Sequence, residues 1–260
     1  MRIVQITDTH IAADGPGASA RADDLARVID DINRLRPLPD AVIHTGDIAH
    51  RGRSGDYARA AKLLAQLEAP LHTVAGNRDD RGRLAVALGG TIGALTAPPY
   101  LQYAVEGHRV RLVALDTKSA DSNRGTICDD RFALLDRLLG SEKKRPAVVF
   151  MHHPPFDVPG SKYPFQFETR ATVKRLDGML RGHRQVVAVL CGHAHRASED
   201  SIGGRRVLTA PSVAVDLRRG ESASAHRRAP CYLLHDIDAA GAVSTTRRTV
   251  TADHTLRRAG

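Results

Sequence analysis

The stretch QVVAVLCGHAH, residues 185–195, places two histidines immediately after a run of apolar residues. Apolar runs of this length, bounded by glycine and polar residues, are typical of strands buried inside a sheet. The strand would end near Cys191, so His193 and His195 would lie in the turn that follows. In open α/β sheets, ligands bind beyond the carboxyl ends of the strands. The position of the two imidazoles therefore predicts a functional site at this edge.

Four further predicted strands end in the same kinds of side chain. They are RIVQI (2–6), AVIHT (41–45), LHTVA (71–75) and AVVFM (147–151), and the side chains after them are Asp8, His10, Asp47, Asn77, His152 and His153. Each residue alone has an ordinary explanation, such as a helix N-cap or a hydrogen-bonded core histidine. Together at one edge, aspartates and histidines are costly to bury without a cation. The joint pattern predicts a metal site, and imidazole, carboxylate and amide ligands suit Mn, Fe, Zn or Co.

Amphipathic segments alternate with these strands. Helical spacing of apolar residues covers 25–37, 57–69, 130–141 and 169–183, and this alternation predicts a sheet covered on both faces. After residue 205 the pattern changes, and RRVLT (205–209), VAVDL (213–217) and CYLLHDI (231–237) suggest a second, more antiparallel sheet packed on the first. The segment GPGAS (15–19) lacks the spacing of a phosphate-binding loop, so an ordinary loop is expected there.

Composition narrows the class of protein. The 260 residues hold 38 Lys and Arg against 29 Asp and Glu, a formal net charge of +9, which favours anionic ligands. No basic stretch is interleaved with aromatic residues, which disfavours nucleic acid as a partner. The three widely separated cysteines fit a reducing compartment. With no apolar leader after Met1 and no apolar run of 18 residues, we expect a cytoplasmic protein without a signal peptide or membrane span.

Five short motifs together resemble those of the calcineurin-like metallophosphoesterases. The motifs are Asp8-x-His10, Gly46-Asp47, Gly76-Asn77, His152 and Gly192-His193-x-His195, and their order and spacing match from residue 8 to residue 195. The chain length, HHPP at 152–155 and APSVAVDL at 210–217 are similar to the class III cyclic-nucleotide and glycerophosphodiester phosphodiesterases. With the strand–helix alternation, the resemblance implies an α/β fold in a single domain over 1–260. The expected architecture is a four-layer αββα sandwich of two mixed sheets flanked by helices.

The resemblance also implies a dinuclear metal centre. The first metal would be held by Asp8, His10, Asp47 and His195, and the second by Asp47, Asn77, His152 and His193, with Asp47 bridging. Only the resemblance chooses His152 over His153 as the ligand, and His153 is then a candidate substrate-binding residue. The segment 161–168 could either cover the pocket or form an oligomer contact. By analogy with related small phosphodiesterases, a homodimer or higher homo-oligomer is expected.

The implied activity is hydrolysis of small anionic phosphodiesters by a metal-bridging hydroxide. Cyclic nucleotides, glycerophosphodiesters and aryl phosphodiesters are the expected substrates. A phosphomonoesterase or a nuclease on the same site remains an alternative. A catalytically idle binding protein of the same fold is a further alternative, which the complete set of seven ligands disfavours.

One position departs from the family pattern. Where the superfamily usually has Gly-Asn-His-Asp/Glu, this chain has Gly76-Asn77-Arg78-Asp79. The usual histidine is thought to contact the substrate phosphate or protonate the leaving oxygen. Arginine, with a pKa above ~12, cannot donate a proton usefully but can bind phosphoryl oxygens with two parallel hydrogen bonds. We therefore expect Asn77 and Arg78 to bind substrate and assist catalysis, unless Arg78 pairs with Asp79 or Asp80 on the surface.

Overall fold

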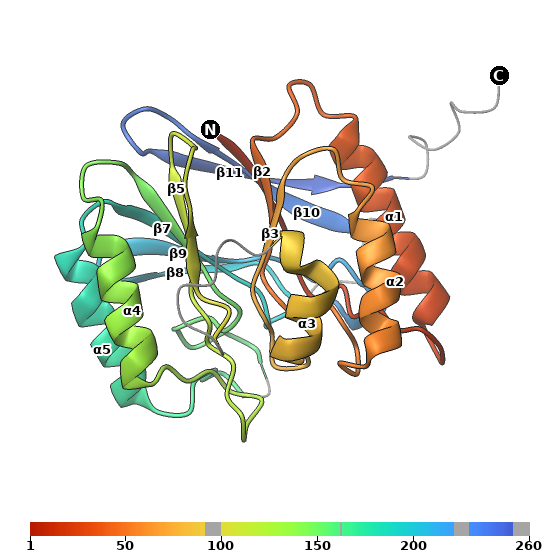
Figure 1. The fold of residues 1–260 in the computed structure, drawn as a ribbon, viewed down its shortest axis with the longest axis horizontal. Helices are drawn as coiled ribbons and strands as arrows, with labels where there is room; N and C mark the ends of the chain where they lie inside the picture. Colours follow the sequence, from red (N-terminus) through yellow and green to blue (C-terminus); the bar gives the residue numbers. More distant parts are fainter. Residues whose placement is uncertain (92–99, 162, 221–228, 252–260) are drawn as a thin grey trace.

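Two β-sheets packed against each other form the centre of the structure, a computed structural model that describes residues 1–91, 100–161, 163–220 and 229–251 (Figure 1). The first sheet has the order β11-β10-β1-β2-β3. Its strands are β1 (Arg2–Ile6), β2 (Ala41–His44), β3 (Leu71–Thr73), β10 (Cys231–Ile237) and β11 (Val243–Thr249). The second sheet has the order β4-β5-β6-β7-β9-β8. Its strands are β4 (Tyr103–Val105), β5 (Arg111–Ala114), β6 (Ala147–Phe150), β7 (Val186–Cys191), β8 (Ser198–Ile202) and β9 (Arg205–Thr209).

Helices cover the outer faces of the two sheets (Figure 1). The first sheet carries α1 (Ala18–Asn33), α2 (Ser54–Leu64) and α3 (Arg81–Leu88), and the second carries α4 (Asp129–Gly140) and α5 (Arg170–Gly182). Two 3-10 turns complete the described elements, η1 (Gly89–Thr91) and η2 (Val215–Leu217). Within the described ranges, each helix is too short or too polar to cross a bilayer. The predicted four-layer αββα arrangement of two mixed sheets is confirmed.

The central strands of the second sheet are buried on both faces. Successive side chains of a strand point to opposite sides, and in β6 Val148 and Phe150 join a core with Ile3 and other residues of the first sheet. The alternate residues of β6 pack instead in a second core with side chains of α4 and α5. The continuous apolar run of such strands therefore reflects packing against a sheet on one side and helices on the other.

The C-terminal strands do not form a separate antiparallel sheet, so that prediction is wrong. β9 lies parallel to β7 in the second sheet, and β10 lies antiparallel to β1 in the first. The segment 213–217 is not a strand, because η2 occupies its last three residues. The long basic loop 218–230 is described only in part, and residues 221–228 lie outside the described residues.

The starts of two helices differ from prediction, and side-chain caps mark the starts of two. α1 begins at Ala18, inside the segment GPGAS that was expected to be loop throughout. α3 was not predicted at all, and it begins after Asp80, whose carboxylate accepts the N–H of Arg83 at 2.8 Å. Similarly, the hydroxyl of Thr169 accepts the N–H of Thr172 at the start of α5. A short helix with an apolar face of only two buried residues, Leu84 and Leu88, gives too weak a periodic pattern to be recognised.

Candidate metal centre at the strand ends

The turns after five parallel strands meet at one edge of the sandwich. β1, β2 and β3 belong to the first sheet, whereas β6 and β7 belong to the second. These turns carry every predicted ligand: Asp8 and His10 after β1, Asp47 after β2, Asn77 after β3, His152 after β6, and His193 and His195 after β7. The candidate centre is therefore built by both sheets together.

The first group of side chains contains Asp8, His10, Asp47 and His195. One ligand atom from each lies within 4.8 Å of those of the other three. His195 Nε2 lies 3.2 Å from Asp8 Oδ1 and 3.2 Å from His10 Nε2. His10 Nε2 in turn lies 3.5 Å from Asp47 Oδ2. The set is the one predicted for the first metal.

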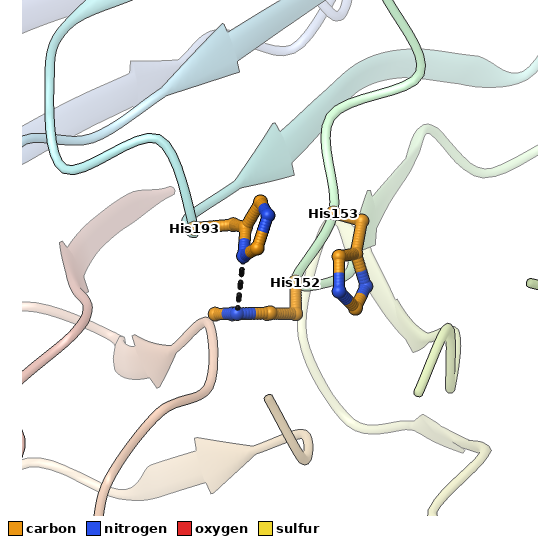
Figure 2. A group of neighbouring side chains, drawn as sticks. All are labelled: His152, His153 and His193. Atoms are coloured by element: carbon orange, nitrogen blue, oxygen red, sulfur yellow. Dashed lines mark hydrogen bonds between the residues drawn. The ribbon is translucent and has the colours of Figure 1, made fainter. Parts of the chain in front are cut away.

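The second group lies on the other side of Asp47. Asn77 Oδ1 lies 3.0 Å from His152 Nε2 and 2.9 Å from His193 Nδ1, and the two imidazole nitrogens are 3.2 Å apart. Figure 2 shows His152 and His193 facing each other across this short distance. His152 Nε2 also lies 3.5 Å from Asp47 Oδ1. Asp47 thus directs one oxygen to each group, which is the arrangement a bridging ligand needs.

The hydrogen bonds of His152 and His153 distinguish the two neighbouring rings. His152 Nδ1 lies 2.7 Å from the carbonyl oxygen of Thr45, so it donates there and leaves the lone pair of Nε2 toward the centre. His153 is engaged at both nitrogens, by Thr117 Oγ1 at 2.8 Å and the carbonyl of Asn123 at 3.2 Å. His153 is fully buried and does not line the cavity that opens beside the candidate centre. Its position therefore does not favour the predicted contact with substrate.

Burial sets the protonation of the imidazoles. It lowers the pKa of His10 to about 2 and that of His193 to about 3, so both rings are neutral and can act as ligands. Burial also acts to lower the pKa of His195, but the adjacent Asp8 carboxylate outweighs it and raises the pKa to about 8. In the protein without cations, His195 is therefore protonated beside Asp8. A cation bound here would displace that proton.

The donor set fits a pair of cations. Asp8 and Asp47 are both buried, and Asp8 Oδ1 lies 3.2 Å from the imidazole Nε2 of His195, another predicted ligand. Burying two carboxylates in one site is costly unless they bind cations. The remaining ligand atoms are imidazole nitrogens and one amide oxygen, a set that suits the transition metals named above.

The backbone at the candidate ligands is strained. Within the described ranges, five non-glycine residues have positive φ, and all five are predicted ligands: Asp8 (52°), His10 (44°), Asp47 (54°), His193 (65°) and His195 (55°). The left-handed region costs an L-residue about 1–2 kcal/mol. Strain of this kind persists only where the surrounding structure fixes it, and it gathers at functional sites.

Glycines allow the turns to approach each other. A Cβ on Gly76 would lie 2.2 Å from both the backbone nitrogen and Oδ1 of Asp47. A Cβ on Gly192 would lie 2.1 Å from the hydroxyl of Thr7. Asp79 then holds the turns after β2 and β3 together, because its buried carboxylate accepts the N–H groups of Ala49 at 3.0 Å and Gly76 at 2.9 Å. The glycines before Asn77 and His193 are therefore steric requirements of the site.

Comparison with known proteins agrees with this geometry. The model of the calcineurin-like phosphoesterase family matches residues 1–197. The chain belongs to this family. A protein of Arcobacter nitrofigilis named "Probable glycerophosphodiester phosphodiesterase GpdQ" is 30% identical over 242 residues, 90% of this chain and 88% of the relative. The 3',5'-cyclic adenosine monophosphate phosphodiesterase CpdA of Pseudomonas aeruginosa is 30% identical over 241 residues, 90% of this chain and 85% of the relative. A dimetal phosphatase from Danio rerio shares the fold, with a TM-score of 0.71 at 16% identity, over 96% of this chain and 98% of that chain.

A cavity of about 610 Å³ opens beside the two groups in this calcineurin-like phosphoesterase. Arg78 lines it, and within the described residues the guanidinium forms no ion pair with Asp79 or Asp80. Those two carboxylates bind backbone N–H groups instead, and Asp80 also faces Arg83. The predicted alternative of a surface ion pair for Arg78 is wrong.

This cavity is lined by residues of the segment 161–168 and by residues that were not predicted from the sequence. Ser161, Tyr163 and Gln166 line it, which supports the prediction that 161–168 covers the pocket, although residue 162 lies outside the described residues. Asn123, Arg196 and Arg219 also line it and were not predicted. Arg196 follows His195 directly, and that adjacency is the one signal in the sequence that could have identified it.

Helix α1 supports His195 through η2. His195 Nδ1 donates to the carbonyl of Leu217 at 2.9 Å, which leaves Nε2 free to bind a metal. Next to Leu217, the carboxylate of Asp216 accepts hydrogen bonds of 2.8–3.1 Å from the guanidinium of Arg21, a buried residue of α1. Asp24, one turn further along α1, accepts the N–H of Val215 at 2.9 Å. The orientation of this candidate ligand therefore depends on an ion pair outside the centre.

We expect Gly76→Ala to abolish the centre, because the new methyl group overlaps Asp47. Metal content after dialysis against Mn²⁺ should fall below one ion per chain when measured by atomic emission. The matched control is Gly178→Ala in α5, where a Cβ meets nothing within 4 Å. That change should instead raise the free energy of unfolding by about 0.8–1 kcal/mol. Full metal content in the Gly76→Ala protein would contradict this account of the turn.

We expect Arg21→Met to weaken metal binding roughly tenfold, since outer residues that orient a metal-binding histidine typically contribute that much. Isothermal titration with Mn²⁺ measures the change at the weaker and stronger sites separately. Arg27→Met is the control, because Arg27 lies on the same helix and donates to the carbonyl of Val250 rather than to η2. An equal loss in both variants would show that α1 acts only on general stability.

Proposed function

We propose that this chain is a dinuclear metal phosphodiesterase that hydrolyses small phosphodiesters. The observation that carries the proposal is the position of Asp47, with Oδ2 toward His10 and Oδ1 toward His152. The names of the two relatives at 30% identity, a glycerophosphodiester phosphodiesterase and a cyclic nucleotide phosphodiesterase, support the class of substrate. Cyclic nucleotides, glycerophosphodiesters and aryl phosphodiesters are the substrates we favour.

Asp8, His10, Asp47 and His195 would hold one cation, and Asp47, Asn77, His152 and His193 would hold the other. When bound, two such cations supply positive charge to the phosphoryl oxygens and lower the pKa of a water molecule between them. Asn77 Nδ2 donates to Asn123 Oδ1 at 3.3 Å, and this bond turns the amide oxygen toward His152 and His193. His153 would keep His152 in place by ring packing, at 4.8 Å between centroids.

Arg78 would bind the phosphoryl group from the open side of the centre. Its backbone N–H donates to Asp47 Oδ1 at 2.7 Å, which fixes the residue beside the bridging carboxylate. Its guanidinium lines the cavity without a carboxylate partner in the described residues, so two of its N–H groups can meet two phosphoryl oxygens. The negative charge that develops on those oxygens would be stabilised there.

The test of the proposed function compares bis(p-nitrophenyl) phosphate with p-nitrophenyl phosphate in the presence of Mn²⁺. We expect the diester to have the higher kcat/KM. Asp47→Asn should reduce kcat/KM for the diester by more than about a hundredfold, because the cations held by this carboxylate would no longer stabilise the negative charge on the phosphoryl oxygens. Asp200→Asn, an exposed carboxylate on β8, is the control and should leave the rate unchanged. Faster hydrolysis of the monoester would indicate a phosphomonoesterase, and full activity of Asp47→Asn would overturn the proposed centre.

Arg78→His tests the role of the departure from the family motif. We expect turnover of 3',5'-cyclic AMP, which has an alkoxide leaving group, to rise roughly tenfold or more, because a histidine can protonate the leaving oxygen. Hydrolysis of bis(p-nitrophenyl) phosphate, with its better leaving group, should change least. Arg78→Lys keeps the charge without the paired N–H groups and serves as the control. A fall in kcat on both substrates would show that Arg78 does not occupy the place of the general acid.

A further inference from the structure

The cavity beside the candidate centre carries more positive charge than one phosphodiester requires. Arg78, Arg196 and Arg219 line it, whereas among the described lining residues the single carboxylate is that of Asp47, a predicted metal ligand. Two divalent cations with Asp8 and Asp47 would leave a charge of about +2 before the arginines are counted. A phosphodiester contributes one negative charge. The remaining positive charge of the cavity is therefore available to another anionic group.

Arg196 and Arg219 lie together on one wall of this cavity. Arg219 is placed by its backbone N–H, which donates to the carbonyl of His195 at 2.9 Å. Arg196 donates from Nη1 to the carbonyl of Pro159 and from Nη2 to that of Gly160 at 3.4 Å. A Cβ on Gly220 would lie 2.9 Å from Cζ of Arg196, so the backbone just after Arg219 lies against this guanidinium. The two residues are thus held by neutral backbone groups beside a candidate ligand.

Their lack of carboxylate partners sets them apart from neighbouring arginines. Arg51 and Arg53 follow the β2 turn, and both pair with Asp14 at 3.0–3.1 Å. Arg81 pairs with the buried Asp116 at 2.6 Å. Over the described ranges, Arg196 and Arg219 have no such pair, and the acceptors of Arg196 are carbonyl oxygens. Among the described residues no carboxylate compensates their charge, as expected for groups that bind an anion.

We propose that Arg196 and Arg219 form a second anion subsite, which binds a phosphate carried by the substrate in addition to the scissile phosphodiester. This inference rests on the proposed function, and it narrows the substrate class to small diesters with a further phosphate nearby. A volume of about 610 Å³ is within the range of small-molecule sites, which favours a small molecule over a polynucleotide as the occupant. Substrates with a cationic head group are disfavoured by the same charges.

The kinetic test uses two substrates that differ only in the second phosphate. They are thymidine 5'-(p-nitrophenyl phosphate) and the same compound with a 3'-phosphate. We expect kcat/KM to be roughly tenfold higher for the 3'-phosphorylated compound, because hydrogen bonds from charged groups to a phosphate typically contribute that much. In Arg219→Ala the ratio should fall toward one, and Arg219→Lys should restore part of it. A ratio near one in the wild type, or a ratio unchanged in Arg219→Ala, would overturn the subsite.

Arg184→Ala is the matched control. Arg184 is exposed just before β7, at the opposite end of that strand from His193, and it is not among the residues that line the cavity. The substitution removes the same charge and should leave both the ratio and the rates unchanged. An equal fall of the ratio in Arg184→Ala would show that net charge alone is responsible and would overturn the subsite.

A binding measurement separates the subsite from the proposed reaction. Isothermal titration of adenosine 3',5'-bisphosphate and adenosine 5'-monophosphate should show tighter binding of the bisphosphate, with the difference lost in Arg219→Ala. This result in a chain that hydrolyses neither thymidine ester would support the subsite while the proposed function fails. Equal binding of both nucleotides would overturn the subsite even in an active enzyme. A further gain in affinity with each added nucleotide of an oligothymidylate would also overturn it, because the occupant would then be a polynucleotide.

Discussion

The carboxylate of Asp47 lies between two clusters of imidazoles, and the rest of the site is arranged around it. One of its oxygens lies 3.5 Å from His10 and the other 3.5 Å from His152. Burial raises the pKa of this carboxyl to about 6, which expresses the cost of keeping it charged without a cation. The neighbouring turn accommodates this carboxylate in two ways. The backbone N–H of Arg78 donates a hydrogen bond to it, and Gly76, which has no side chain, lies close against it. The motif Gly-Asn-x-Asp in the neighbouring turn is therefore a consequence of the position of Asp47.

Local strain at the ligands is offset by bonds made elsewhere. Five ligands adopt left-handed backbone conformations, and the turns that hold them are fixed by buried polar contacts. Asp79 accepts backbone N–H groups from two turns, while Ser212 Oγ donates to the carbonyl of Asp8 at 2.8 Å. None of these contacts touches substrate, yet each limits how far a ligand can move. Their role is to hold the donors in place before a cation arrives.

The side chains at the strand ends could be predicted because they follow from short-range patterns, whereas the four layers and the assignment of ligands to two metals followed from the resemblance to the family. Apolar strands end at a defined residue, and parallel strands bring such residues to the same edge. The pairing of β9 and β10 with different sheets could not be predicted, because strand pairing depends on contacts between residues far apart in the chain. The role of VAVDL in η2 was missed for the same reason: its alternation is that of a strand, and contacts with residues distant in the chain, among them Arg21 and Asp24 of α1, hold it as a turn. The assignment of His152 rather than His153 remains a prediction, supported by their different hydrogen-bond partners, Thr45 and Thr117.

The candidate ligands come from both sheets, and this has a mechanical consequence. Asp8 and Asp47 extend from the first sheet, whereas His152, His193 and His195 extend from the second. Cations coordinated by all of them would cross-link the two halves of the sandwich where the halves meet. Resistance to sliding of one sheet over the other would then depend on the supply of metal in the surroundings. The bound ions would thus stabilise the packing of the two sheets in addition to their part in catalysis.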